Sequence, residues 1–166
     1  IQTLLVIILS SLFSGVLAIP PGSINNRALF EAAANDDPKT IELLLNNGVD
    51  IEARNKDQQT ALLIATHHNS IDAASVLIRA GADVNAKDRI QDTPFLYAGA
   101  EGRLEILKLT LQYGAKLNDL NRYGGTALIP AAHHGHVDTV RTLLQTRIDM
   151  DHINDLGWTA LHEAVI

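Results

Sequence analysis

Histidine is the residue type in this sequence whose number and spacing could support chemistry. Seven histidines are present, and four of them form the adjacent pairs His67-His68 and His133-His134. Neutral imidazole is a common metal ligand, and its pKa suits general acid-base work near neutral pH. Whether the two pairs can act together depends on the elements that carry them.

Other catalytic patterns are missing from the 166 residues. The sequence contains no cysteine, which excludes disulfides, cysteine nucleophiles and thiolate metal sites. It contains no glycine-rich phosphate loop, no serine nucleophile elbow and no HExxH zinc motif. We therefore predict that this segment is not an enzyme, holds no cofactor and takes no small-molecule substrate.

Composition and charge argue against a nucleic-acid partner. Hydrophobic residues make up 46% of the chain and aromatic residues only 4%, a bias that suits short, closely packed helices. The formal net charge is −6, with 13 basic residues scattered along the sequence. Nucleic-acid binding needs a concentrated basic face, and an anionic membrane surface attracts long basic runs. We predict neither as a partner of the mature chain.

An internal repeat organises the sequence from residue 28 to residue 166. Four kinds of position recur at a constant step of 33 without a gap: Thr60, Thr93, Thr126 and Thr159; Leu62, Phe95, Leu128 and Leu161; Ala65, Ala98, Ala131 and Ala164; Gly48, Gly81 and Gly114. A fixed period of this length indicates a solenoid in which one supersecondary unit is stacked repeatedly.

The sequence of each unit predicts two short helices. The repeated threonine is a hydroxyl N-cap, and Pro94 follows Thr93 at the first helical position, where proline is tolerated. The first helix then ends at a residue that accepts a left-handed backbone, at Asn69, Gly102 and Gly135. The second helix carries apolar residues at helical spacing and ends at the repeated glycine.

These units resemble the ankyrin repeat. The resemblance is clearest at residues 81–86, GADVNA, and 157–164, GWTALHEA, and it covers nearly all residues after the first eighteen. It implies an all-α solenoid of helix-turn-helix units joined by short β-hairpin connections. The expected ankyrin-repeat domain spans residues 19–166, with units at about 22–54, 55–87, 88–120 and 121–153, and a truncated fifth from 154.

Three positions depart from the pattern. Gln58 and Gln91 stand where Gly124 and Gly157 supply a turn glycine, so those two hairpins should be strained or differently shaped. Arg147 replaces the glycine that ends the second helix, and a left-handed arginine would cost about 1 kcal/mol. We expect this corner to be the least regular turn.

The beginning of the chain has the layout of an export signal. Leu4 to Leu17 is apolar and uncharged, and Val16-Leu17-Ala18 gives small or modest residues at the two positions that an export peptidase inspects. Residues 19–22, IPPG, follow as a break. We predict a signal peptide over residues 1–18, cleaved after Ala18, and hence a periplasmic or extracellular protein. A buried core helix and a retained membrane anchor are the alternatives. The missing basic leader and the first residue, Ile1, suggest a truncated start.

The end of the chain falls inside the first helix of the fifth unit. Half a repeat cannot cap a stack, and Leu161, Ala164 and Val165 would then face solvent. We expect the natural protein to continue past Ile166.

The repeat geometry bears on the histidines. Adjacent repeats lie about 10 Å apart, so two repeats separate the pairs by about 20 Å, too far to share a metal ion at about 2 Å per bond. We therefore predict no metal site, and exposed polar residues at helix ends instead. The resemblance implies structural roles for His136 and His162.

The resemblance also implies a partner protein on the concave face, which hairpin tips and first helices form. The predicted partner-binding residues are Arg89, Ile90, Tyr97, Arg122, Tyr123, Leu156 and Trp158. Apolar and aromatic groups beside arginine are typical of interface hot spots, and Ile64, Pro130 and Glu163 share the row of Tyr97. The alternative is that these tip residues pack locally on neighbouring tips.

The predicted function is a scaffold or adaptor that binds another protein, in the manner of stand-alone exported bacterial ankyrin proteins. Two alternatives stay open. The stack could be the binding domain of a larger protein whose further part carries another activity, or a structural protein that self-assembles through its repeat ends.

Overall fold

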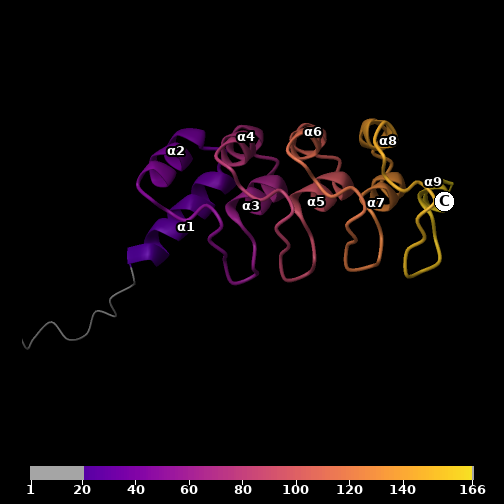
Figure 1. Ribbon diagram of the computed structural model, residues 1–166, viewed down its shortest axis with the longest axis horizontal. Coiled ribbons are helices and arrows are strands. Elements are labelled where there is room, and N and C mark those ends of the chain that lie inside the picture. Colours follow the sequence, from indigo (N-terminus) through magenta and orange to yellow (C-terminus); the bar gives the residue numbers. More distant parts are fainter. Residues whose placement is uncertain (1–20, 166) are drawn as a thin grey trace, which may run out of the picture.

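The repeating sequence unit folds into one helix pair per repeat (Figure 1). The computed structural model describes residues 21–165, and the predicted signal segment, residues 1–18, lies outside them. The helices are, in chain order, α1 Pro21–Ala34, α2 Pro38–Asn46, α3 Ala61–His68, α4 Ile71–Arg79, α5 Pro94–Ala100, α6 Leu104–Gln112, α7 Leu128–His133, α8 Val137–Leu144 and α9 Ala160–Ala164.

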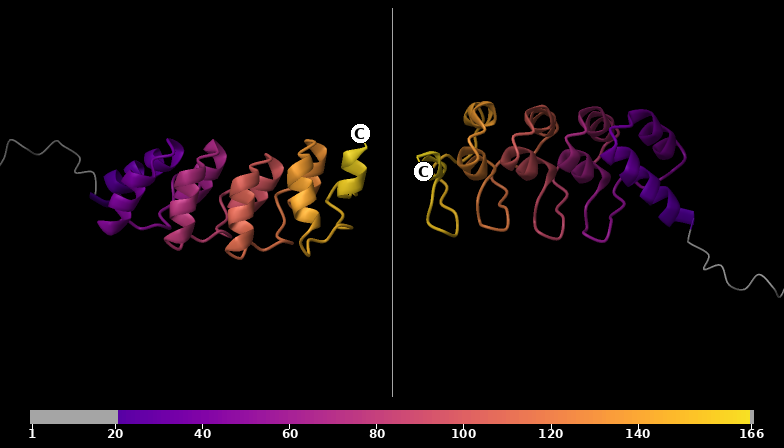
Figure 2. Two further views of the ribbon diagram at one scale, coloured as in Figure 1. Left: turned by 90° about the horizontal axis from the view of Figure 1, so that it is seen from above. Right: turned by 180° about the vertical axis from the view of Figure 1, so that it is seen from behind.

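The helices form two layers along one axis (Figures 1 and 2). The inner helices α1, α3, α5, α7 and α9 lie side by side, and the outer helices α2, α4, α6 and α8 cover one side of them. The connections between repeats project from the other side as hairpins that all point the same way. Inner helices and hairpins therefore border a common face, where side chains from several repeats can meet.

Small residues let the inner helices approach closely. Ala65, Ala98 and Ala131 are completely buried. At Gly99 an added Cβ would lie only 2.8 Å from the Cβ of Ala127, so even alanine would force α5 and α7 apart. Larger buried side chains fill the space between the layers, among them Leu29, Ile41, Leu62, Leu77, Phe95, Ile106, Leu107, Leu128 and Leu143.

A ladder of polar side chains joins each repeat to the next. Glu52, Asn85 and Asn118 occupy one position in three consecutive repeats, and each side-chain oxygen accepts a backbone N–H from the following repeat at 2.8–2.9 Å. Such bonds satisfy backbone donors that lie outside any helix. They fix the offset of one repeat on its neighbour.

Threonine N-caps form at three of the four predicted positions. The hydroxyls of Thr60 and Thr93 accept the backbone N–H three residues later, at 3.3 and 3.1 Å. Thr159 forms a capping box with His162, whose ring nitrogen accepts the Thr159 backbone N–H. The structural role predicted for His162 is therefore confirmed.

The predicted cap at Thr126 is wrong, because of Pro130. In the other repeats the threonine carbonyl accepts the N–H four residues later, but Pro130 has no N–H to donate. The Thr126 carbonyl instead accepts the Ile129 N–H at 3.3 Å, which is the amide that the hydroxyl would have bound. The α7 helix begins only at Leu128, and the buried Thr126 hydroxyl has no hydrogen-bond partner.

The turn after α8 is rebuilt around a threonine. Arg147 does not adopt a positive φ. The Thr146 hydroxyl donates to the Leu143 carbonyl at 2.6 Å and accepts the Ile148 N–H at 3.1 Å. In the equivalent turn after α4 the corresponding amide and carbonyl bond directly, at 3.0 Å. The hydroxyl replaces that direct bond, so the corner is irregular as predicted, but without a strained arginine.

The repeats are joined by hairpins without strands. Each hairpin tip is closed by a backbone hydrogen bond across five residues, yet no residue between 21 and 165 belongs to a β-strand. Gln58 and Gln91 keep the left-handed conformation of the turn glycines, with φ of 62° and 69°. A side chain is disfavoured there, so the predicted strain is present. The all-α fold is confirmed.

Within the described range, none of the helices has the length and apolar character needed to cross a membrane.

We predict that Thr93→Val and Thr126→Val change the free energy of unfolding differently, although they alter the same position of the repeat. Thr93→Val removes a formed cap and should lower the free energy of unfolding by about 1 kcal/mol. Thr126→Val removes a buried hydroxyl without a partner and should leave stability unchanged or raise it by about 1 kcal/mol. Urea denaturation followed by circular dichroism measures both variants.

Pro130→Ala supplies the control for this comparison. This substitution restores a backbone N–H at position 130 for the Thr126 carbonyl, which leaves the Ile129 N–H free for the Thr126 hydroxyl. Thr126→Val should therefore become destabilising in the Pro130→Ala background. Equal losses for Thr93→Val and Thr126→Val in the parent chain would contradict our explanation of the missing cap.

Candidate functional site

One side chain in each repeat holds the hairpin tip in shape. Asn55, Asp88, Asn121 and Asn154 occupy the same position of consecutive repeats, and the Oδ1 atom of each accepts the backbone N–H groups two and four residues later, at 2.8–3.0 Å. Short polar side chains that bond nearby amides are a common way to fix a turn. The tip residues between these amides are therefore presented in a fixed conformation.

Neighbouring tips are bonded to each other in two places but not in a third. The Arg89 N–H donates to the Asp57 carbonyl at 3.1 Å, and the Asp155 N–H donates to the Tyr123 carbonyl at 3.0 Å. The equivalent bond between Arg122 and Ile90 does not form among the described residues. The tips at residues 88–92 and 121–125 are therefore not tied by a backbone bond.

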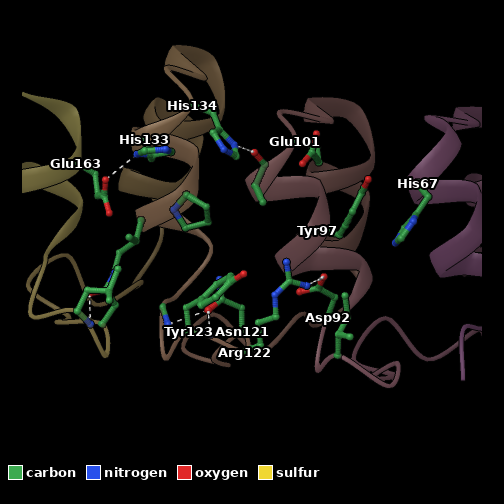
Figure 3. Close-up of a pocket in the computed structure, with 17 residues that line it drawn as sticks. His67, Asp92, Tyr97, Glu101, Asn121, Arg122, Tyr123, His133, His134 and Glu163 are labelled. Carbon is green, nitrogen blue, oxygen red and sulfur yellow. Dashed lines mark hydrogen bonds and ion pairs between the residues drawn. The ribbon is translucent and has the colours of Figure 1, made fainter. Parts of the chain in front are cut away.

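A pocket of about 580 Å³ opens across these two tips and the inner helices behind them (Figure 3). We call it the central pocket. Its hairpin side comprises Ile90, Asp92, Asn121, Arg122, Tyr123, Gly125, Asn154 and Leu156, and its inner-helix side comprises His67, Tyr97, Ala100, Glu101, Ile129, Pro130, His133, His134 and Glu163. Its size lies within the range typical of ligand sites.

An aromatic stack forms one end of the central pocket. The rings of His67 and Tyr97 lie 3.8 Å apart at an angle of 11°, and Figure 3 shows Tyr97 between His67 and the middle of the pocket. Burial lowers the pKa of His67, against the opposing influence of Asp88. The His67 Nε2 atom is buried without a hydrogen-bond partner. The stack is thus held by ring packing, and His67 favours its neutral form.

Two further histidines lie along the opposite wall (Figure 3). The Nδ1 atom of His133 is 2.7 Å from Oε2 of Glu163 on α9, and Nδ1 of His134 is 2.7 Å from the carbonyl oxygen of Ala100. Each contact joins adjacent repeats. Both histidines therefore have a hydrogen-bond partner in a neighbouring repeat.

Asp92 lies partly buried at the foot of the pocket, where only 16% of its side chain is exposed. Burial raises its pKa, the neighbouring carboxylates Asp88 and Glu101 also raise it, and Arg122 lowers it. The Arg122 Nη1 atom is 4.0 Å from Asp92 Oδ2, and its guanidinium lies 4.8 Å from the centre of the Tyr123 ring. The charge on Asp92 is therefore only partly balanced.

The structure brings together five of the seven predicted partner-binding residues. Ile90, Tyr97, Arg122, Tyr123 and Leu156 all line the central pocket. Ile90, Tyr123 and Leu156 keep 41%, 55% and 71% of their surface exposed, although they are large and apolar or aromatic.

The other two predicted residues lie outside the central pocket. Arg89 turns back to the preceding tip, where its Nη2 atom is 2.7 Å from Asp57 Oδ1. This contact matches the local-packing alternative for that residue. Trp158 is partly exposed near the last tip.

Three residues that line the central pocket were not predicted to belong to the binding surface: His67, Asp92 and Glu101. His67 belongs to the histidine pair at the C-terminal end of α3, and Glu101, which follows α5 directly, occupies the position that His68 and His134 hold in the adjacent repeats. Polar residues recur at these helix ends, and this recurrence could have predicted that they line the same side of one pocket. Nothing in the period marks Asp92, since its equivalents are Gln59, Gly125 and Trp158.

No group of three or more His, Asp or Glu side chains within residues 21–165 is placed to hold a metal ion.

Comparisons with known proteins agree with this architecture. The family model for ankyrin repeats, which describes three copies, matches residues 29–121 and, in an overlapping match, residues 95–166. An ankyrin repeat domain from Acinetobacter baumannii AYE, known from a crystal structure, is 59% identical to this chain with a TM-score of 0.81. That match covers 83% of this chain and 70% of the other. A search of curated proteins found no match.

We predict that Asp92→Asn stabilises the fold at neutral pH. Folding raises the pKa of this carboxyl, so its protonated form favours the folded state. That contribution is complete below the usual pKa of 3.8 and is lost as the pH rises through the pKa of the folded state. Ionised Asp92 therefore lowers stability at pH 7, and the neutral amide removes that penalty. The gain in melting temperature should shrink as the pH is lowered toward 4.

Asp72→Asn on the exposed face of α4 is the matched control, since it removes the same charge from a chain of net charge −6. If both variants gain equally, the effect comes from net charge and the local explanation fails.

Proposed function

The chain belongs to the ankyrin-repeat family, and from that premise we propose that it is a scaffold that binds another protein through the central pocket and the hairpin tips around it. Ankyrin repeats are generally protein–protein interaction modules. The observation that carries the proposal is the convergence of Ile90, Tyr123 and Leu156, exposed side chains of three consecutive tips, on one pocket.

The arrangement suits binding better than turnover. Exposed apolar and aromatic groups gathered beside an arginine have the composition of an interface hot spot. The anchored tips need little reordering on binding, which limits the entropic cost of association. The histidines at the pocket wall contact Glu163 and a backbone carbonyl, and the fold is typically non-enzymatic. A binding role uses each of these features without a reacting group.

We propose in addition that the protein is exported to the periplasm or beyond. Leu4 to Leu17 is an uncharged apolar stretch followed by the small residue Ala18 and a proline break at Pro20. If the segment is a cleaved signal, N-terminal sequencing of the protein recovered from the cell envelope or medium of its native host should begin at Ile19. Recovery only from the cytosol, or with residues 1–18 still attached to a membrane, would refute cleavage and export.

The interaction proposal predicts that the immobilised protein captures a partner from envelope or extracellular extracts, identified by mass spectrometry. The triple variant Ile90→Ala, Arg122→Ala and Tyr123→Ala should lose at least tenfold in capture, since truncation of a hot-spot side chain typically costs about 2 kcal/mol or more in binding.

A composition-matched triple variant on the outer helices controls for general effects on solubility and folding. Tyr113→Ala, Val137→Ala and Arg141→Ala remove the same kinds of exposed side chain from that surface, and capture should persist. Circular dichroism verifies that both triple variants are folded. Equal capture by the two would move the binding surface away from the central pocket, and no capture by the parent protein would overturn the scaffold proposal.

A further inference from the structure

The central pocket carries more negative than positive charge. Its lining includes the carboxylates Asp92, Glu101 and Glu163 but one guanidinium, Arg122, which leaves a net charge of −2 when the histidines are neutral. Glu163 is engaged by His133. Arg103, the other cation close to Tyr97, does not line the pocket.

Neither Asp92 nor Glu101 is closely paired. The 4.0 Å separation of Arg122 from Asp92 is long for a charge-assisted hydrogen bond, and the exposed guanidinium is screened by solvent. Glu101 makes no ion pair with any residue in the described part of the chain. Asp88 places a further carboxylate behind Asp92, at the tip position where the other three anchored tips use a neutral asparagine.

The charges of Glu101 and Asp92 both act on the phenol of Tyr97. Burial raises the pKa of this phenol, Glu101 raises it further, and the opposing influence of Arg103 is followed by a smaller upward influence of Asp92. His67 covers one face of the ring, and the opposite side is turned toward the middle of the pocket (Figure 3). A cation over the face of a tyrosine is attracted by the ring quadrupole, so ring and carboxylates favour the same kind of ligand group.

We propose that the central pocket binds an extended segment of the partner protein that carries a lysine or arginine side chain next to an aliphatic or aromatic residue. This inference rests on the proposed scaffold function and specifies its partner. The basic side chain lies along Tyr97, with its charged group between Asp92 and Glu101. The apolar neighbour packs on Ile90 and Tyr123 at the hairpin tips.

The untied tips favour an extended segment. Between residues 88–92 and 121–125 the Ile90 carbonyl and the Arg122 N–H form no backbone bond with each other, unlike their equivalents in the adjacent tips. Because Ile90 and Arg122 both line the pocket, this carbonyl and this amide can offer one acceptor and one donor to a bound chain, in the manner of main-chain recognition by an exposed edge. An extended strand with alternating side chains can use both and still place one side chain in the pocket.

The charge balance decides against other occupants. An acidic segment would bring a like charge to Asp92 and Glu101, which suppresses association. A purely apolar segment would bury both carboxylates without a counter-charge, which is unfavourable. A basic side chain relieves this imbalance.

Pools of nine-residue peptides test the proposal. In each pool the central residue is fixed as lysine, arginine, norleucine or glutamate, the flanking residues are randomised and both ends are blocked. Norleucine matches the length of lysine without its charge. The purified protein should retain peptides from the lysine and arginine pools at least about tenfold above the norleucine pool, the factor expected for a hydrogen bond to a charged group. The retained peptides should also be enriched in apolar residues beside the centre.

Two double variants locate the effect. Asp92→Asn with Glu101→Gln should abolish the preference for basic peptides and leave the apolar enrichment. Glu42→Gln with Asp72→Asn, on exposed positions of α2 and α4, changes the net charge equally and should keep the preference. Circular dichroism monitors folding, and Ile90→Ser with Tyr123→Ser should remove the apolar enrichment.

The outcomes separate this inference from the scaffold proposal. Equal retention of the lysine and norleucine pools, or equal loss in both charge variants, overturns the basic segment, while the capture of a protein partner decides the scaffold function independently. Retention of no pool above background also overturns the inference. A preference for lysine and arginine that is lost only in the pocket variant supports it.

Discussion

The close approach of neighbouring inner helices sets the dimensions on which the rest of the structure depends. Ala65, Ala98 and Ala131 are fully buried, and Gly99 has no room for a methyl group beside Ala127. Because the inner helices are this close, the hairpins that follow them stand near enough for one tip to donate a backbone hydrogen bond to the next. The central pocket forms where that spacing is kept but the bond between tips is missing.

The sequence was sufficient to predict the fold because each repeat encodes it locally. A threonine cap, a left-handed corner and small residues at the helix contact recur with the same period, and a slip in register would break all of them together. Two local predictions failed or changed for reasons also present in the sequence. Pro130 has no N–H for the Thr126 carbonyl, which therefore accepts the Ile129 N–H that the Thr126 cap requires. The Thr146 hydroxyl makes a left-handed Arg147 unnecessary.

The candidate site was only partly predictable, because it depends on what the repeats do not share. The tip residues Ile90, Tyr123 and Leu156 follow from position within the repeat. The contributions of His67 and Asp92 do not, since they arise from stacking on Tyr97 and from burial between two tips. The period predicts the backbone position of each residue within its repeat. It does not predict the distances between side chains of different repeats, and these distances decide which side chains meet in the pocket.

Residues that are the same in every repeat hold the fold, and residues that differ between repeats can give a regular stack specificity for its partner. The anchor position needs only an oxygen that accepts two amides, and an asparagine supplies it in three of the four anchored tips. Asp88 supplies the same two bonds and adds a negative charge beside Asp92, which folding alone does not require. Burial already disfavours the ionised form of Asp92, so this second carboxylate increases the electrostatic penalty in the unliganded fold. A carboxylate accepts the two amides more strongly than an asparagine oxygen does, but the other three tips show that asparagine is sufficient to hold this turn. The added charge is therefore better explained by the ligand it attracts than by the stack it belongs to.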